Sequence, residues 1–101
     1  MLDELMNTIP NMEYSGEDEN GFEFYGTYED DFSFEFHISK TGRGFKVLIY
    51  LYTNTRFPVR EFRVNVNDID GISKLYETVF NKCKKMSKEM DGLVEWKRNM
   101  S

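Results

Sequence analysis

The side chains that could carry acid–base or nucleophilic chemistry are few in type along this 101-residue chain. Carboxylates are abundant, but His37 is the only histidine and Cys83 the only cysteine. Two carboxylates at a suitable separation can cleave a glycosidic bond, and a histidine beside a serine or cysteine can activate a nucleophile. Either arrangement needs a cleft that excludes water, and a small two-layer domain offers little room for one. We therefore predict that the protein is not an enzyme and has no catalytic residues.

The spacing of candidate ligands along the sequence does not indicate a metal or cofactor site either. The stretch from Val66 to Glu77 places acids at several positions of a calcium-binding loop, but its first position is Val66, which has no ligand atom. Its acids are better explained as caps of a following helix. A zinc site at His37 would need ligands from distant parts of the chain, and we expect His37 to pair with Glu23 across a hairpin instead. The sequence predicts no metal and no cofactor.

Charge is divided sharply between two parts of the chain. Residues 1–39 carry eleven acidic side chains and no lysine or arginine, which gives a formal charge of −11. Residues 40–101 carry all 13 basic side chains against seven acids, which gives +6, and the whole chain has a formal charge of −5. Such asymmetry bears on partners and solubility rather than on fold.

Hydrophobic periodicity predicts a short N-terminal helix followed by a meander of four antiparallel strands. The apolar residues of segment 2–9 recur at helical spacing, and Pro10 ends that helix. The polar stretch 13–21 is predicted to be a loop. Alternating apolar residues and intervening turn signals indicate strands over residues 21–28, 32–39, 45–54 and 58–66.

From Asp70 the apolar residues follow the period of a long amphipathic helix. Gly92 is predicted to end this helix, and Trp96 beyond it is expected to pack back onto the domain. The chain is thus predicted to be one α+β domain, residues 1–101, in which the C-terminal helix covers one face of the sheet. The expected core consists of Phe22, Phe24, Phe34, Phe36, Val47, Ile49, Phe62, Val64, Leu75, Val79, Phe80 and Cys83.

The tight turns also predict which residues share the second face of the sheet. If Tyr28 pairs with Phe32, Glu23 lies opposite His37 on that face. Between the next two strands, we expect Phe36 opposite Val47. The second face is then both aromatic and acidic, and it is either exposed or covered by another element. Its predicted partner-binding residues, with the adjoining turn, are Glu23, Tyr25, Glu29, Asp30, Asp31, Glu35, Tyr50 and Tyr52.

In size and charge distribution the chain resembles small phage-encoded anti-defence proteins, such as anti-CRISPR and anti-restriction inhibitors. The resemblance is one of class and includes no shared motif. It implies a protein-binding inhibitor whose carboxylates and tyrosines occupy a basic nucleic-acid-binding site of a host defence protein.

Two other functions stay open from the sequence. The aromatic face could be the groove of an adaptor or chaperone-like module that binds a protein segment. Alternatively, basic side chains of segment 56–63 and of the C-terminal helix could contact phosphates while Tyr50 and Tyr52 stack on bases, although the acidic half would repel nucleic acid.

The acids Asp3 and Glu4 stand where a signal peptide would carry bases, which favours a cytoplasmic protein, in the host cell if it is phage-encoded. We expect a protein partner rather than nucleic acid or a membrane. The sequence leaves open whether the protein is a monomer or a dimer.

Overall fold

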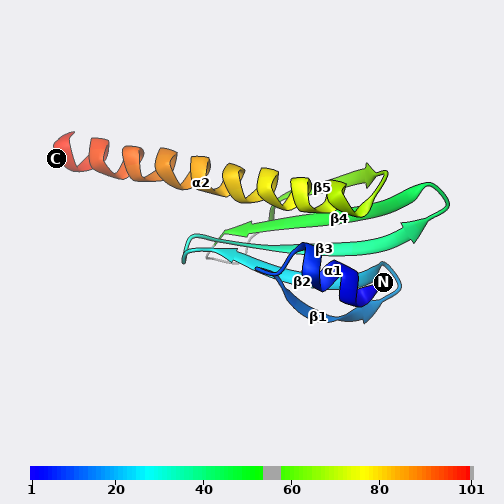
Figure 1. Ribbon diagram of the computed structural model, residues 1–101. Coiled ribbons are helices and arrows are strands. Elements are labelled where there is room, and N and C mark those ends of the chain that lie inside the picture. Colours follow the sequence, from blue (N-terminus) through cyan, green and yellow to red (C-terminus); the bar gives the residue numbers. More distant parts are fainter. Residues whose placement is uncertain (54–57, 101) are drawn as a thin grey trace.

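A five-stranded antiparallel sheet forms the centre of the fold (Figure 1). The computed structural model describes residues 1–53 and 58–100, and it describes the side chains of these residues except at 58, 59 and 90–100. The elements in chain order are α1 (Leu2–Thr8), β1 (Glu13–Asp18), β2 (Gly21–Tyr28), β3 (Phe32–Thr41), β4 (Gly44–Thr53), β5 (Pro58–Val66) and α2 (Ile69–Met100). The predicted α+β class, with a short first helix and a long last one, is confirmed.

The strands lie side by side in the order in which they occur along the chain, β1-β2-β3-β4-β5. Each strand pairs antiparallel with the next. In such a meander, residues that are close in sequence stay on neighbouring strands. A difference in charge between the first and second parts of the chain therefore becomes a difference between the two sides of the sheet.

Strand β1 was not predicted, because segment 13–21 was expected to be a loop. It pairs with β2 from Glu13 opposite Tyr25 to Asp18 opposite Gly21, with an irregularity between Tyr14 and Gly16. Nearly all of its residues are exposed, so it lacks the alternation of buried and polar side chains by which strands are recognised. The sheet consequently has five strands rather than four.

The register between β2 and β3 is as predicted, with Tyr28 opposite Phe32 and Glu23 opposite His37. The register between β3 and β4 is not: Phe36 lies opposite Ile49, and Val47 lies opposite Ile38. The turn that joins these strands is centred on Gly42 and Arg43, one residue later than expected, which moves the pairing by two residues. Because side chains alternate with a period of two, the two faces keep their predicted members.

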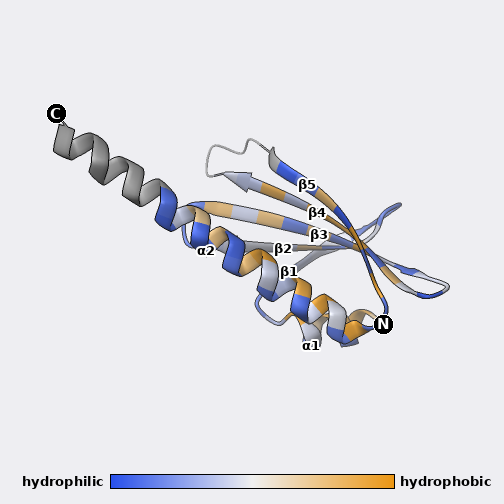
Figure 2. Ribbon diagram, turned by 90° about the horizontal axis from the view of Figure 1, so that it is seen from above, coloured by the Kyte–Doolittle hydropathy of each residue, from blue (hydrophilic) through white to orange (hydrophobic). Residues whose placement is uncertain are grey.

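Both helices pack on one face of the sheet (Figure 2). Of the predicted core, Phe24, Phe34, Phe36, Val47, Ile49, Val79 and Cys83 are buried, and Phe22, Phe62, Val64 and Leu75 are partly buried against them. Phe80 is only partly buried and meets the ring of Tyr28 edge-on at 5.1 Å. Helix α1 and the residues after it add Leu5, Ile9 and Met12 to the same core. The opposite face, called the outer face below, is covered by neither helix.

Helix α2 begins beside Asp68, whose Oδ1 accepts a hydrogen bond from the backbone N–H of Gly71 at 2.9 Å. This is the acidic cap that the sequence predicts. The prediction that Gly92 ends the helix is wrong, because α2 continues to Met100 and extends beyond the sheet (Figure 1). One glycine costs a helix interior only about 1 kcal/mol, which is too little to end a helix that already extends from Ile69.

The side chain of Trp96 lies outside the described residues, so its expected packing is not tested. No helix among the described residues is long and apolar enough to cross a membrane.

Candidate functional site

The outer face gathers polar and aromatic side chains in rows that run across the sheet. Register places Glu23, His37 and Leu48 in one row over β2, β3 and β4. The next row contains Tyr25, Glu35 and Tyr50. Tyr25 is 39% exposed, whereas His37 and Leu48 are 7% and 6% exposed. The middle of this face is therefore packed by its own side chains, and the tyrosines and glutamates form its accessible surface.

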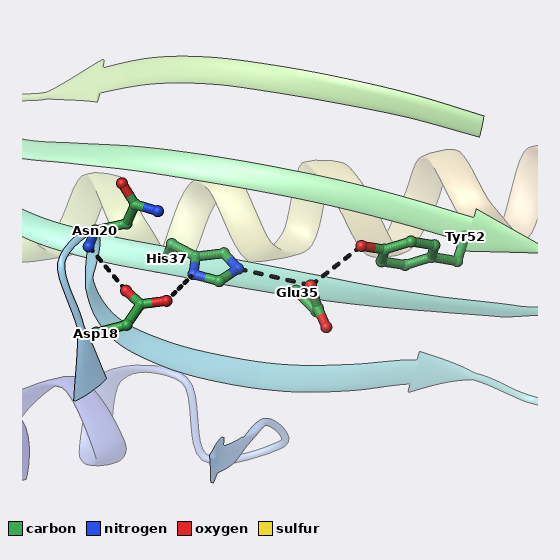
Figure 3. A network of polar contacts seen from close by, with 5 residues as sticks. All are labelled: Asp18, Asn20, Glu35, His37 and Tyr52. Atoms are coloured by element: carbon green, nitrogen blue, oxygen red, sulfur yellow. Dashed lines mark hydrogen bonds and ion pairs between the residues drawn. The ribbon is translucent and has the colours of Figure 1, made fainter. Parts of the chain in front are cut away.

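A chain of polar contacts runs along the outer face on the side away from α2 (Figure 3). The hydroxyl of Tyr52 donates a hydrogen bond to Oε2 of Glu35 at 3.2 Å. The same Glu35 oxygen lies 3.6 Å from Nε2 of His37, and Nδ1 of His37 lies 3.7 Å from Oδ2 of Asp18. The other oxygen of Asp18 accepts a hydrogen bond from the backbone N–H of Asn20 at 2.8 Å. The contacts thus link residues of β1, β3, β4 and the turn after β1, with His37 in the middle.

Tyr52 stays a hydrogen-bond donor at neutral pH. Burial raises the pKa of its phenol above the ordinary value, and the negative charge of Glu35 beside it raises that pKa further. Both effects disfavour the phenolate, since a second negative charge next to Glu35 would be repelled. The Tyr52–Glu35 contact is therefore a fixed element of the surface over the physiological pH range.

An open depression of about 470 Å³ lies beside this network, lined by Tyr25, Ser33, Glu35 and Tyr52. A second depression shares Tyr25 and Ser33 with the first and extends to Glu29 and Asp30 at the end of the sheet. Because the two are contiguous, a partner that covers the tyrosines would also meet the carboxylates of the turn. Both depressions are open to solvent, which suits contact with a larger surface.

Most of the predicted partner-binding residues come together. Glu23, Tyr25, Glu35, Tyr50 and Tyr52 share the outer face, and the exposed Glu29 and Asp30 lie at its end. Asp31 does not belong to this surface, because its Oδ2 accepts a hydrogen bond from Ser87 of α2, which packs on the other face of the sheet. The predicted surface therefore keeps seven of its eight residues.

The ion-pair contacts of His37 within 4.0 Å are with two carboxylates other than that of Glu23, its expected partner. His37 and Glu23 are opposite each other in register, as predicted. Asp18 and Glu35 are the two carboxylates that approach the imidazole, and Asp18 comes from a strand that was not foreseen. The ring of His37 additionally meets that of Tyr50 edge-on, with centroids 5.3 Å apart.

A signal for the missed strand was present in the sequence. Asn20–Gly21 is a dipeptide typical of tight turns, and it follows segment 13–18 at the start of the predicted strand 21–28; in the structure the two loop residues are Glu19 and Asn20. Gly21 has φ 107°, and a Cβ atom there would lie 2.1 Å from the carbonyl oxygen of Ile38. This turn brings Asp18 beside His37.

Charge is separated across the sheet because the strands follow chain order. Strands β1 to β3 and the turns between them carry Glu13, Glu17, Asp18, Glu19, Glu23, Glu29, Asp30, Asp31 and Glu35. Basic side chains begin with Lys40 at the end of β3 and continue through the next turn, β4, β5 and α2. They include Arg63 on β5 and Lys84, Lys85 and Lys88 on the exposed part of the helix. Tyr50 and Tyr52 lie on β4 next to β3, and Tyr25 lies on β2. The chain matches no protein-family model, no curated protein and no solved structure.

Proposed function

We propose that this protein binds a basic, nucleic-acid-handling protein through its outer face and thereby blocks the partner's nucleic-acid-binding site. One observation supports the proposal: acidic side chains and accessible tyrosines lie together on the sheet face that neither helix covers. A resemblance in size and charge to small anti-defence inhibitors points to the same class, with a host defence protein as the partner.

The physical basis is complementarity of charge together with aromatic contact area. On the outer face, Glu23 of β2 and Glu35 of β3 lie in neighbouring rows, Asp18 of β1 lies beside His37, and Glu29 and Asp30 lie at the end of the sheet, so this part of the surface is negative. A groove that binds phosphates has the opposite charge, so it attracts such a surface and brings the two proteins together faster. Tyrosines are frequent anchors at interface centres, where their burial holds the complex together after encounter.

Direct binding of nucleic acid fits the geometry less well. Tyr50 lies between Glu35 and Glu61 in register, and the hydroxyl of Tyr52 contacts Glu35. A base stacked on either ring would place its phosphates next to these carboxylates. The basic side chains of α2 belong to a helix that packs on the opposite face of the sheet. Arg63 does share the outer face, opposite Leu48, but its Nε lies 3.9 Å from Oε1 of Glu61, so a carboxylate stands next to this base as well.

The test begins with affinity capture from host-cell extract on the tagged full chain, followed by purification of the captured protein. Association and dissociation rates are then measured at low and at physiological salt. Glu29→Gln combined with Asp30→Asn should slow association several-fold at low salt and leave dissociation nearly unchanged. The partner's nucleic acid should compete with the unmodified chain for binding.

The matched control removes the same charge elsewhere. Asp3→Asn combined with Glu4→Gln changes two exposed acids on α1, away from the outer face, and should slow association less. Equal effects of the two double variants, or no competition by nucleic acid, would contradict the proposal. Association that is insensitive to salt would instead favour an adaptor-type apolar contact.

A further inference from the structure

His37 is buried without satisfying its polar atoms. The residue is 7% exposed, and both ring nitrogens are buried without a hydrogen-bond partner. Among the residues that the structure describes, no other buried side-chain nitrogen or oxygen atom lacks a hydrogen-bond partner. An unsatisfied buried polar group is costly, so a histidine in this position calls for a ligand or ion that the side chain would bind.

The groups around His37 are carboxylates held at the spacing of metal ligands. One ligand atom each from Asp18, Glu23 and His37 lies within 4.8 Å of the others. Nδ1 of His37 and Oδ2 of Asp18 are 3.7 Å apart, which is too long for a hydrogen bond. Two atoms that each lie about 2.1 Å from one ion are about 3.4 Å apart at a tetrahedral angle, which is close to this separation.

We propose that Asp18, Glu23 and His37 bind a divalent transition-metal ion of the Zn²⁺ type. An imidazole nitrogen with two carboxylate oxygens suits Zn²⁺ and its first-row neighbours, whereas Ca²⁺ and Mg²⁺ prefer oxygen ligands alone. Three protein ligands leave a position open for water or for a group from a partner. The Asp18 side chain is 45% exposed, so the site opens to solvent and its carboxylate can move to close the ligand set.

The surrounding contacts have the arrangement that orients metal ligands in proteins. A ligating histidine commonly directs its other ring nitrogen at a carboxylate, and here Nε2 faces Glu35 at 3.6 Å. Tyr52 in turn holds Glu35 through its hydroxyl (Figure 3). Asn20 occupies the second oxygen of Asp18, which leaves Oδ2 directed at His37. Glu35 is thus a positioning residue for the site rather than a ligand.

The competing explanation is a protonated His37 held by the surrounding carboxylates. An imidazolium ion would donate from both nitrogens, yet the nearest carboxylate oxygens are 3.6 and 3.7 Å away and neither contact is a hydrogen bond. This explanation predicts no affinity for Zn²⁺ beyond that of an ordinary acidic surface. The two explanations therefore differ in a measurable way.

The test uses the full chain after removal of metal by a chelator. Calorimetric titration with ZnCl₂ should show one site per chain, and Zn²⁺ should raise the melting temperature, because an ion that binds only the folded state stabilises it. His37→Gln should abolish both effects, and Asp18→Asn should weaken binding at least tenfold. If His37→Gln fails to fold, Asp18→Asn and Glu23→Gln decide the matter alone. Asp18 and Glu23 lie outside the core.

Three controls separate the site from general acidity and from the thiol. Glu61→Gln removes a carboxylate from the same sheet face on β5, and Cys83→Ala removes the buried thiol; neither should change Zn²⁺ affinity. Glu35→Gln should weaken binding about 10–100-fold without removing a ligand. Binding of Ca²⁺ as tight as that of Zn²⁺, or Zn²⁺ affinity unchanged in His37→Gln, would overturn the proposal. Its outcome does not depend on whether the outer face binds a basic partner.

Discussion

The hydroxyl of Ser87 in α2 donates a hydrogen bond to Oδ2 of Asp31, in the turn between β2 and β3, at 2.5 Å. Ser87 is 6% exposed and Asp31 is half-buried, so the contact is largely shielded from water. It joins the long helix to the end of the sheet at a point 56 residues away in sequence. Three consecutive acids, Glu29, Asp30 and Asp31, therefore have two different roles: the last one holds α2, and the first two face solvent.

We expect Ser87→Ala to destabilise the protein by about 1.5–3 kcal/mol, the range for a hydrogen bond to a charged group, because the half-buried Asp31 carboxylate loses its partner. Asp31→Ala should have a similar effect, whereas Asp31→Asn keeps an acceptor oxygen and should cost less. Urea unfolding at neutral pH measures all three. Asp30→Ala, at the exposed neighbour, is the control and should change stability little. Equal losses at positions 30 and 31 would show that the helix contact contributes nothing.

Glu29 has φ 48°, a left-handed conformation that is unfavourable for a glutamate. Asparagine tolerates this conformation better, and glycine adopts it freely. Glu29→Asn or Glu29→Gly should therefore raise the free energy of unfolding by about 0.5–1 kcal/mol. Asp30 has no positive φ, so Asp30→Gly should lower stability instead. Opposite signs at these adjacent positions in thermal melts would confirm the turn geometry.

Phe36 lies at the centre of the sheet, is fully buried and contacts Phe34 with ring centroids 6.0 Å apart. Phe36→Ala should cost about 3–5 kcal/mol, because the substitution removes buried apolar surface and leaves a cavity. Tyr25 lies on the outer face of the sheet and is 39% exposed, so Tyr25→Ala should cost far less. A loss close to zero for Phe36→Ala would mean that the faces of β3 are inverted.

The inner face could be predicted from the sequence because its residues alternate strongly with polar ones and the first turn fixes their register. Phe24 opposite Phe36 follows from the short turn after Tyr28. The predicted β3–β4 pairing differs from the observed one by two residues. The sequence of segment 40–44 allows a two-residue turn at Thr41–Gly42, as predicted, or at Gly42–Arg43, as observed. Only the position of the turn, which periodicity does not report, distinguishes them.

The outer face was predicted in part for the same reason. The positions of its tyrosines and glutamates follow from the alternation of side chains along β2, β3 and β4. The approach of Asp18 to His37, in contrast, depends on the edge strand β1. An edge strand with one large apolar side chain, Tyr14, carries almost no hydrophobic signal. The role of Asp31 was also missed, because a hydrogen bond to a helix 56 residues later leaves no trace in local spacing.

Cys83 should be unreactive in the folded protein. It is fully buried, and burial raises the pKa of its thiol to about 11, so almost no thiolate exists at pH 8. Alkylation by iodoacetamide should be slow in buffer and fast in denaturing urea. Because the unfolded thiol ionises near pH 8.5–9, unfolding releases this proton at higher pH. Its contribution to stability is therefore complete below about pH 8.5 and is lost as the pH rises toward 11. Fast alkylation of the native protein would contradict the burial of this thiol.

Tyr52 provides the sharpest test of how the proposed complex is held together. Its ring lines the depression on the outer face, and its hydroxyl contacts Glu35. Tyr52→Ala removes an anchor that would be buried in the complex, so we expect dissociation to accelerate about tenfold or more, a change of about 1.4 kcal/mol, while association stays nearly unchanged. Tyr52→Phe keeps the ring and loses only the hydroxyl, so its dissociation rate should lie much closer to that of the unmodified chain.

The Glu29 and Asp30 variants should show the opposite pattern, with slower association and unchanged dissociation, because exposed charge steers the encounter and contributes little afterwards. Stopped-flow or surface-based kinetics with the purified partner separates the two rates. If Tyr52→Ala leaves dissociation unchanged, the tyrosines are not anchors, and the partner contacts another part of the molecule.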